Sequence, residues 1–233
     1  PLGIVLNFEH CDPADASPEA VQAALINDGI YNRWFAGAIM QGYYPADVIE
    51  AFGSHMPVGF EQDMPTISED IDWLGVNYYT RALHQPAKGM SVLDATDTQT
   101  VPGPLDKTAM GWEIYPEGLE KLLVRLKNEY TGDLPLFVTE NGMAWDDRIS
   151  YGEIHDTERQ EYFSLHLQAC KAAMQQGVPL KGYFAWSLLD NYEWAEGYEK
   201  RFGIVHVDYR TQFRRPKDSY LDFQKGLLDR RQS

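Results

Sequence analysis

The sequence is poor in basic residues and in long apolar runs. It carries 20 Lys and Arg against 35 Asp and Glu, a net charge of −15, and no cluster of basic residues. A surface this acidic repels phosphate backbones and anionic lipid. No apolar run approaches the roughly 18 residues that a membrane helix needs. We therefore expect neither a nucleic acid nor a membrane among its partners.

Cysteine is also scarce. The two residues, Cys11 and Cys170, form no C-x-x-C pair and suggest no disulfide framework. The opening residues 1–7 lack the basic segment and the cleavage pattern of a signal peptide. No N-x-S/T glycosylation acceptor occurs. These absences lead us to expect a cytoplasmic protein with reduced thiols.

Several well-known motifs are missing as well. The sequence has no G-x-G-x-x-G, no phosphate-binding G-x-x-x-x-G-K-[ST], no H-E-x-x-H and no G-x-S-x-G. The six histidines are scattered and none pairs with another at a metal-ligand spacing. We therefore expect neither a metal nor an organic cofactor.

What the sequence does contain is an alternation of apolar runs and helical segments. Strands are predicted at residues 2–8, 71–78, 135–139 and 181–188. Their apolar residues are nearly continuous, which is typical of parallel strands that are covered on both faces. Helices are predicted at residues 17–41, 116–130, 156–177 and 216–228. The alternation indicates an α/β fold made of βα units.

The length of these units is unusual. Four βα units in 233 residues average about 58 residues each, whereas a plain (β/α)8 barrel averages about 31. Two interpretations follow: a complete four-stranded domain with large insertions, or half of a barrel. Four parallel strands alone leave exposed edges, which proteins normally avoid, and Pro1 directly precedes the first strand. Both facts favour a half-barrel over residues 1–233, without an internal domain boundary.

Two neighbouring strand ends carry polar and aromatic residues. The third predicted strand leads directly into Glu140, and Asn141-Gly142 after it indicates a turn. Carboxylates at the C-terminal ends of parallel strands face the mouth at which barrel enzymes keep their catalytic groups. The fourth strand ends at Trp186, and residues 190–198 then interleave acids with aromatic rings. Flat rings stack on sugar C–H faces and carboxylates bind hydroxyls, which favours a carbohydrate site over an acidic surface loop.

Four segments together resemble glycoside hydrolase family one, the β-glucosidase family. They are WLGVNYYTR at 73–81, GWEIYPEG at 111–118, TENG at 139–142 and GYFAWSLLDNYEWAEGYEKRFGIVHVD at 182–208. The resemblance extends over essentially the whole chain. It implies a retaining β-glycosidase on a (β/α)8 TIM barrel, with these four strands as barrel strands five to eight.

The resemblance also implies roles for catalytic residues. Glu140 would be the nucleophile that forms the covalent glycosyl-enzyme. Tyr79 would donate a hydrogen bond to that carboxylate and help to keep it ionised. Asn77 would lie beside the sugar 2-hydroxyl and the nucleophile.

Five further residues would bind the substrate. Glu193 would bind the 4- and 6-hydroxyls of the non-reducing sugar, and Trp194 would contact its 3-hydroxyl. Trp186 would form the floor on which the ring stacks, and Phe202 would close the edge of the pocket. Trp112 would line the aglycone side. A carboxylate at Glu193 repels phosphate, so the expected substrate is a neutral β-glucoside or a short β-linked oligosaccharide.

The sequence departs from the family pattern in one respect. Retaining glycosidases need a second carboxyl group as acid/base, which the family places in a T-x-N-E-P motif, and no N-E-P occurs here. We therefore expect the C-terminal half of an enzyme, with the acid/base supplied by the N-terminal half of the barrel as a separate or nicked chain. Glu9 is the nearest internal alternative. A different interpretation is a catalytically silent half-barrel that binds sugar or associates with itself.

Overall fold

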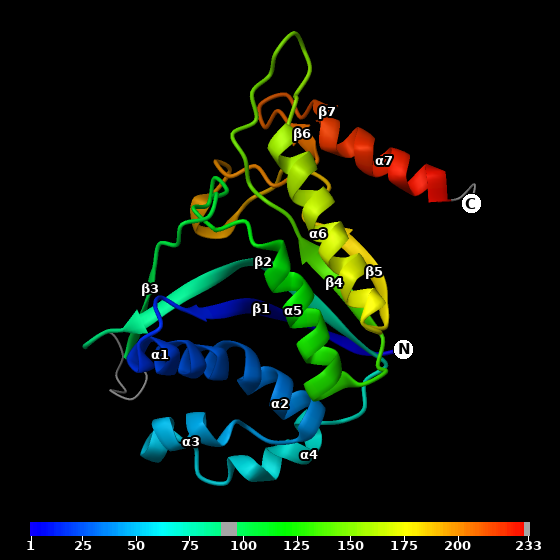
Figure 1. Ribbon diagram of the computed structural model, residues 1–233. Coiled ribbons are helices and arrows are strands. Elements are labelled where there is room, and N and C mark those ends of the chain that lie inside the picture. The colour runs from blue at the N-terminus through cyan, green and yellow to red at the C-terminus, as the bar shows by residue number, and fades with distance from the viewer. Residues whose placement is uncertain (90–96, 231–233) are drawn as a thin grey trace.

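A computed structural model describes residues 1–89 and 97–230 (Figure 1). Its centre is a sheet in which four parallel strands follow the order β1-β2-β4-β5, with β3 antiparallel to β2. The strand bounds are β1 Gly3–Pro13, β2 Trp73–Pro86, β3 Thr98–Val101, β4 Leu136–Asn141 and β5 Leu180–Ala185. All four predicted strands are present. β1 and β2 run well past their predicted ends at residues 8 and 78.

Helices connect these strands. Their bounds are α1 Pro18–Asp28, α2 Trp34–Gln41, α3 Ala46–Phe52, α4 Met64–Ile67, α5 Pro116–Leu126, α6 Thr157–Gln175 and α7 Asp218–Arg230. The predicted helix at 17–41 is one helical run, in which a π-helical turn at Gly29–Arg33 separates α1 from α2. Ser17 caps α1 as expected, since its hydroxyl accepts a hydrogen bond of 3.2 Å from the backbone N–H of Ala20. Within the described part of the chain, no helix combines the length and apolarity needed to cross a membrane.

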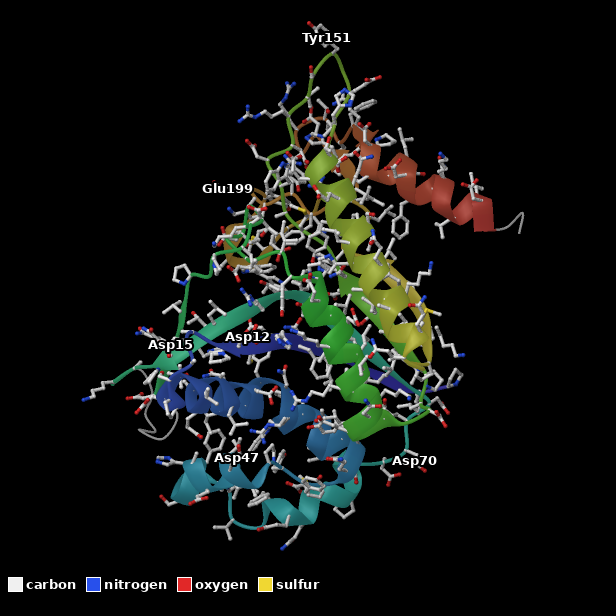
Figure 2. The ribbon with its side chains drawn as sticks, viewed as in Figure 1. Asp12, Asp15, Asp47, Asp70, Tyr151 and Glu199 are labelled. Carbon is white, nitrogen blue, oxygen red and sulfur yellow. The ribbon has the colours of Figure 1, made fainter. Side chains whose placement is uncertain are left out.

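At the start of α6, the side chain of Asp156 does not have the capping role that was predicted for it. Asp156 stands at the N-cap, but its side chain makes no capping bond. Instead it pairs with the buried Arg159 and accepts two hydrogen bonds from Ser219, from the backbone N–H at 2.8 Å and the hydroxyl at 2.6 Å. The carboxylate therefore joins the start of α6 to the start of α7, and these two helix ends lie near each other in Figure 1. The loop before α6 reaches its tip at Tyr151, which projects into solvent (Figure 2).

The helices cover one face of the sheet. Alternate strand residues such as Leu74, Leu136 and Val138 are fully buried there, against Leu119 and other apolar residues of α5. Figure 1 shows α5 and α6 lying along this face. Burial of these side chains is the main source of stability for the sheet.

On the opposite face of the sheet, one row of residues crosses all four parallel strands. Val5, Gly75, Phe137 and Gly182 lie in register across the four parallel strands. A Cβ at Gly75 would lie 2.8 Å from side-chain carbons of Val5 and Thr139, so only glycine permits this close packing. Phe184 follows on β5 and is 57% exposed, and Val5 is 43% exposed. This row is therefore apolar and open in the described part of the chain, and polar residues, Thr139 and Asn77, follow on the same face toward the end of β4.

A small C-terminal unit follows β5. Two short antiparallel strands, β6 Val205–Val207 and β7 Arg214–Pro216, form a hairpin that leads into α7. β6 also makes a parallel bridge through Val205 to Leu189. The Trp186 N–H donates to the Asn141 carbonyl at 2.9 Å, which places the start of the segment between β5 and β6 beside the C-terminal end of β4.

Candidate active site

Glu140 lies at the C-terminal end of β4, where Asn77 on β2 is its direct partner in the sheet. The next residue does not open the expected turn. Asn141 still belongs to β4 and is fully buried, and its amide donates to the Tyr78 carbonyl at 2.7 Å and accepts from the Tyr183 hydroxyl at 2.5 Å. This amide ties β4 to both neighbouring strands, and it thereby fixes the direction in which Glu140 projects.

Two further contacts order the strand ends around Glu140. The Tyr79 hydroxyl donates to Glu140 Oε2 at 2.7 Å. The pKa of Tyr79 is raised, first by burial and then by this carboxylate, so the phenol keeps its proton and remains a donor. The Thr139 hydroxyl donates to Asn77 Oδ1 at 2.7 Å. All three predicted catalytic residues therefore lie together.

Aromatic rings flank this carboxylate. The centroid of Tyr79 is 5.6 Å from that of Trp112 and 6.1 Å from that of Phe202, and the last two rings are also 6.1 Å apart. The three rings form one tilted cluster. Phe202, predicted to close the edge of the sugar pocket, and Trp112, predicted to line its aglycone side, thus both lie beside the tyrosine that donates to Glu140.

Trp186 follows β5 and comes very close to the β4 end. A Cβ at Gly142 would lie 1.8 Å from the Trp186 carbonyl oxygen, so the glycine is needed for this approach. Burial and then the charge of Glu140 raise the pKa of Glu193, whereas a hydrogen bond with the Trp186 side chain lowers it. Glu193 therefore lies within electrostatic reach of Glu140. Burial is the larger cause of this shift, and the repulsion from Glu140 adds to it as expected for two carboxyl groups near one site.

Trp194 is the exception among the predicted site residues. Its side chain is 81% exposed. It begins a short 3-10 turn, Trp194–Glu196, with a positive φ of 42°. No ring contact or side-chain hydrogen bond joins Trp194 to the other site residues in the part of the chain described.

A buried ion cluster holds the loop that carries Glu193. Lys217 is fully buried and pairs with Asp147 and, at 3.1 Å, with Asp190. Asp190 also accepts from Arg201 at 2.9 Å, and Asp147 accepts from Arg159 at 2.9 Å. This cluster was not predicted from the sequence. Its members come from distant segments, and no local spacing marks them.

The parallel βα sheet with a carboxylate at a strand end is the arrangement of an α/β-barrel enzyme. The sequence profile of glycosyl hydrolase family 1 matches residues 1–230. The chain therefore belongs to glycosyl hydrolase family 1.

Individual relatives agree with this assignment. The 1,4-beta-D-glucan glucohydrolase of Thermotoga neapolitana is 44% identical over 225 residues, which are 94% of this chain and 48% of that protein. The solved family 1 b-glucosidase of Thermotoga maritima is 42% identical with a TM-score of 0.91, and the match covers 97% of this chain and 50% of that one. A solved complex of the Thermotoga maritima beta-glucosidase with deoxynojirimycin matches with a TM-score of 0.89 at 44% identity, over 96% of this chain and 50% of the other.

The chain thus spans about half the length of the relatives that it matches. The predicted TIM-barrel fold class and the predicted family are confirmed, with this chain corresponding to about half of such a barrel.

Proposed function

We propose that the chain is the nucleophile-bearing half of a retaining β-glucosidase that hydrolyses terminal β-D-glucosyl residues. The observation that carries this proposal is the 2.7 Å hydrogen bond from Tyr79, in the middle of β2, to Glu140 near the C-terminal end of the adjacent parallel strand β4. It presents an oriented carboxylate beside a cluster of aromatic rings. Relatives named β-glucosidases support the same assignment.

In this mechanism Glu140 attacks the anomeric carbon and forms a covalent glycosyl-enzyme. The glycosidic oxygen leaves with a proton from a second carboxyl group, and water then releases the sugar as that group takes a proton back. Retaining enzymes hold the two carboxyls about 5–5.5 Å apart. Asn77 would contact the 2-hydroxyl, and Trp186 would stack on the ring.

We assign the second carboxyl to the N-terminal half of the barrel, as a separate or nicked chain. The open sheet face supports this assignment, because Val5 and Phe184 present apolar side chains where a closed barrel has a packed interior. Soluble proteins seldom leave contiguous apolar surface uncovered without a partner. Glu9, the internal alternative for the acid/base, lies instead beside Cys11 and His84.

The proposed substrate is neutral. Glu193 places a carboxylate near Glu140, and a second negative charge in the pocket repels a phosphorylated sugar. The complex of a relative with deoxynojirimycin supports a site for a sugar-like ligand. Faster turnover of a 6-phospho-β-glucoside than of the unphosphorylated glycoside would contradict this proposal.

The test begins with the intact mass of the purified protein under denaturing conditions. A second polypeptide that carries an N-E-P motif supports the split barrel. The assembled enzyme is then assayed on an aryl β-glucoside with Glu140→Ala and, as a matched control, Glu50→Ala on α3. We expect Glu140→Ala to abolish turnover, azide to restore part of it, and Glu50→Ala to have no effect. Full activity of Glu140→Ala would overturn the assignment.

A second candidate rests on the same open face. Two copies of the chain could cover one another's apolar surface and form a silent, self-associating module. A dimer by sedimentation without hydrolysis or covalent labelling of Glu140 would favour this alternative over the enzyme.

A further inference from the structure

Three side chains of the types that bind metal ions lie close together, away from Glu140. Glu9 and Cys11 come from the far part of β1, and His84 comes from the far part of β2. One ligand atom from each, a carboxylate oxygen, the thiol sulfur and a ring nitrogen, all lie within 4.8 Å of one another. Asp12, labelled in Figure 2, marks this end of β1.

His84 is the unusual member of the group. It is 3% exposed, and neither of its ring nitrogens has a hydrogen-bond partner within residues 1–89 and 97–230. Its Nε2 lies 3.9 Å from Glu9 Oε1, which is too long for a hydrogen bond. Buried polar atoms are nearly always satisfied in native proteins. The free nitrogens of His84 therefore point to a ligand.

The backbone that carries these side chains is well fixed. Cys11 pairs with Ala82 across the strands, and the Ala14 N–H donates to the His84 carbonyl at 2.8 Å. The Asn32 side chain donates to the Glu9 carbonyl at 2.7 Å and accepts from the Glu9 N–H at 3.1 Å. Such supporting bonds are typical of sites that hold metal ligands in position.

We propose that Glu9, Cys11 and His84 bind a thiophilic divalent cation of the Zn²⁺ class. Sulfur and imidazole ligands select such ions over Mg²⁺ and Ca²⁺, which prefer oxygen. Three protein ligands leave a fourth tetrahedral position for water or another group. Bond lengths of about 2.0–2.3 Å require the three side chains to close around the ion. This site is independent of the proposed glycosidase function, which requires no metal.

Binding of such a cation needs the thiolate of Cys11 and a neutral imidazole at His84. It therefore replaces the Sγ proton of Cys11 by the cation and releases that proton to the buffer.

The experiment uses the whole chain after removal of metals with a chelator. Co²⁺ alone is titrated in, followed by Zn²⁺. We expect one equivalent of Co²⁺ to give a sulfur-to-cobalt charge-transfer band and the visible bands of tetrahedral coordination, and Zn²⁺ to abolish both. Cys11→Ala should remove the charge-transfer band. His84→Gln should weaken binding at least about tenfold.

Two matched variants serve as controls. Cys170→Ala removes the other thiol, and His206→Gln alters another buried histidine with a free nitrogen. Both should keep the spectrum and the affinity of the parent. Absence of the charge-transfer band in the parent protein, or its persistence in Cys11→Ala, would overturn the proposal.

A measurement on the unaltered chain remains decisive even if Cys11→Ala does not fold. Zn²⁺ should slow the alkylation of Cys11 severalfold without changing the rate at Cys170, as read by peptide mass mapping. Equal rates at Cys11 with and without Zn²⁺ would also overturn the proposal.

Discussion

The two faces of the parallel sheet share the same strands but have different surroundings. On the helix face, Phe8 and Val138 are buried among apolar residues of α5. On the open face, Val5 and Phe184 remain exposed although they are equally apolar. The strands alone therefore do not decide what is buried. Helices of this chain cover the helix face, whereas the open face exposes apolar side chains.

The largest expected effect compares two phenylalanines. Phe8 is 2% exposed on the helix face, whereas Phe184 projects from the open face. Phe8→Ala should lower the free energy of unfolding by about 3–5 kcal/mol, because it removes buried surface and leaves a cavity. Phe184→Ala should cost less than about 1 kcal/mol in this chain alone. Urea denaturation measures both, and equal losses would show that the open face is packed.

A second prediction concerns pH and the helix side of the sheet. His166 on α6 is fully buried, with its ring 3.9 Å from that of Tyr162, and burial lowers its pKa to about 4. The unfolded chain binds a proton near pH 6.5, whereas the folded chain does not until about pH 4. The free energy of unfolding should therefore fall by up to about 3 kcal/mol between these values as the pH drops, and not above them.

His166→Gln should flatten this part of the stability profile relative to the parent chain. His155→Gln is the control. His155 is exposed, and its hydrogen bond to Asp218 raises its pKa, so its contribution has the opposite sign and is lost as the pH rises. An unchanged slope between pH 4 and 6.5 in His166→Gln would refute the prediction.

A third prediction uses adjacent tyrosines that point to opposite faces. Tyr79→Phe removes the hydrogen bond to Glu140 but keeps the ring beside Trp112 and Phe202. A hydrogen bond to a charged group is worth about 1.5–3 kcal/mol. We expect kcat/KM of the assembled enzyme to fall roughly 10- to 100-fold, with little change in the urea midpoint.

Tyr78→Phe is the matched control for this experiment. Tyr78 is buried on the helix face, and its hydroxyl donates to the Tyr115 carbonyl at 2.7 Å. Its loss should cost about 1 kcal/mol of stability and leave kcat/KM nearly unchanged. A loss of kcat/KM in Tyr78→Phe as large as that in Tyr79→Phe would mean that the two faces are not functionally distinct.

The sequence predicts the helix face well because a continuous apolar run leaves few alternatives to a buried parallel strand. The far parts of β1 and β2 were missed, since polar residues there pair through their backbones, as His10 does with Arg81. Asn141 shows a related difficulty. An Asn-Gly pair normally indicates a turn, but here the amide is a buried connection between three strands.

The residues of the site differ in how far the sequence alone could predict them. Glu140 could be found from its place at a strand end, whereas Tyr79 is separated from it by 61 residues and was found only through the resemblance to a family. The pairing of Lys217 with Asp147 and Asp190 could not be predicted, because partners so distant in sequence meet only in the fold. The cluster of Glu9, Cys11 and His84 was missed for the same reason.

The smallest expected effect tests how α1 is attached to the helix face. Ser17 accepts a hydrogen bond from the Ala20 N–H, and α1 packs against both β1 and β2. Ser17→Ala should cost about 1 kcal/mol, and Ser17→Thr should restore most of it. Hydrogen exchange should speed up in the first turn of α1 and stay unchanged in α5. Faster exchange in both helices would mean that the helices on this face unfold as one unit. A change confined to α1 means that the helices covering the sheet are separately stable.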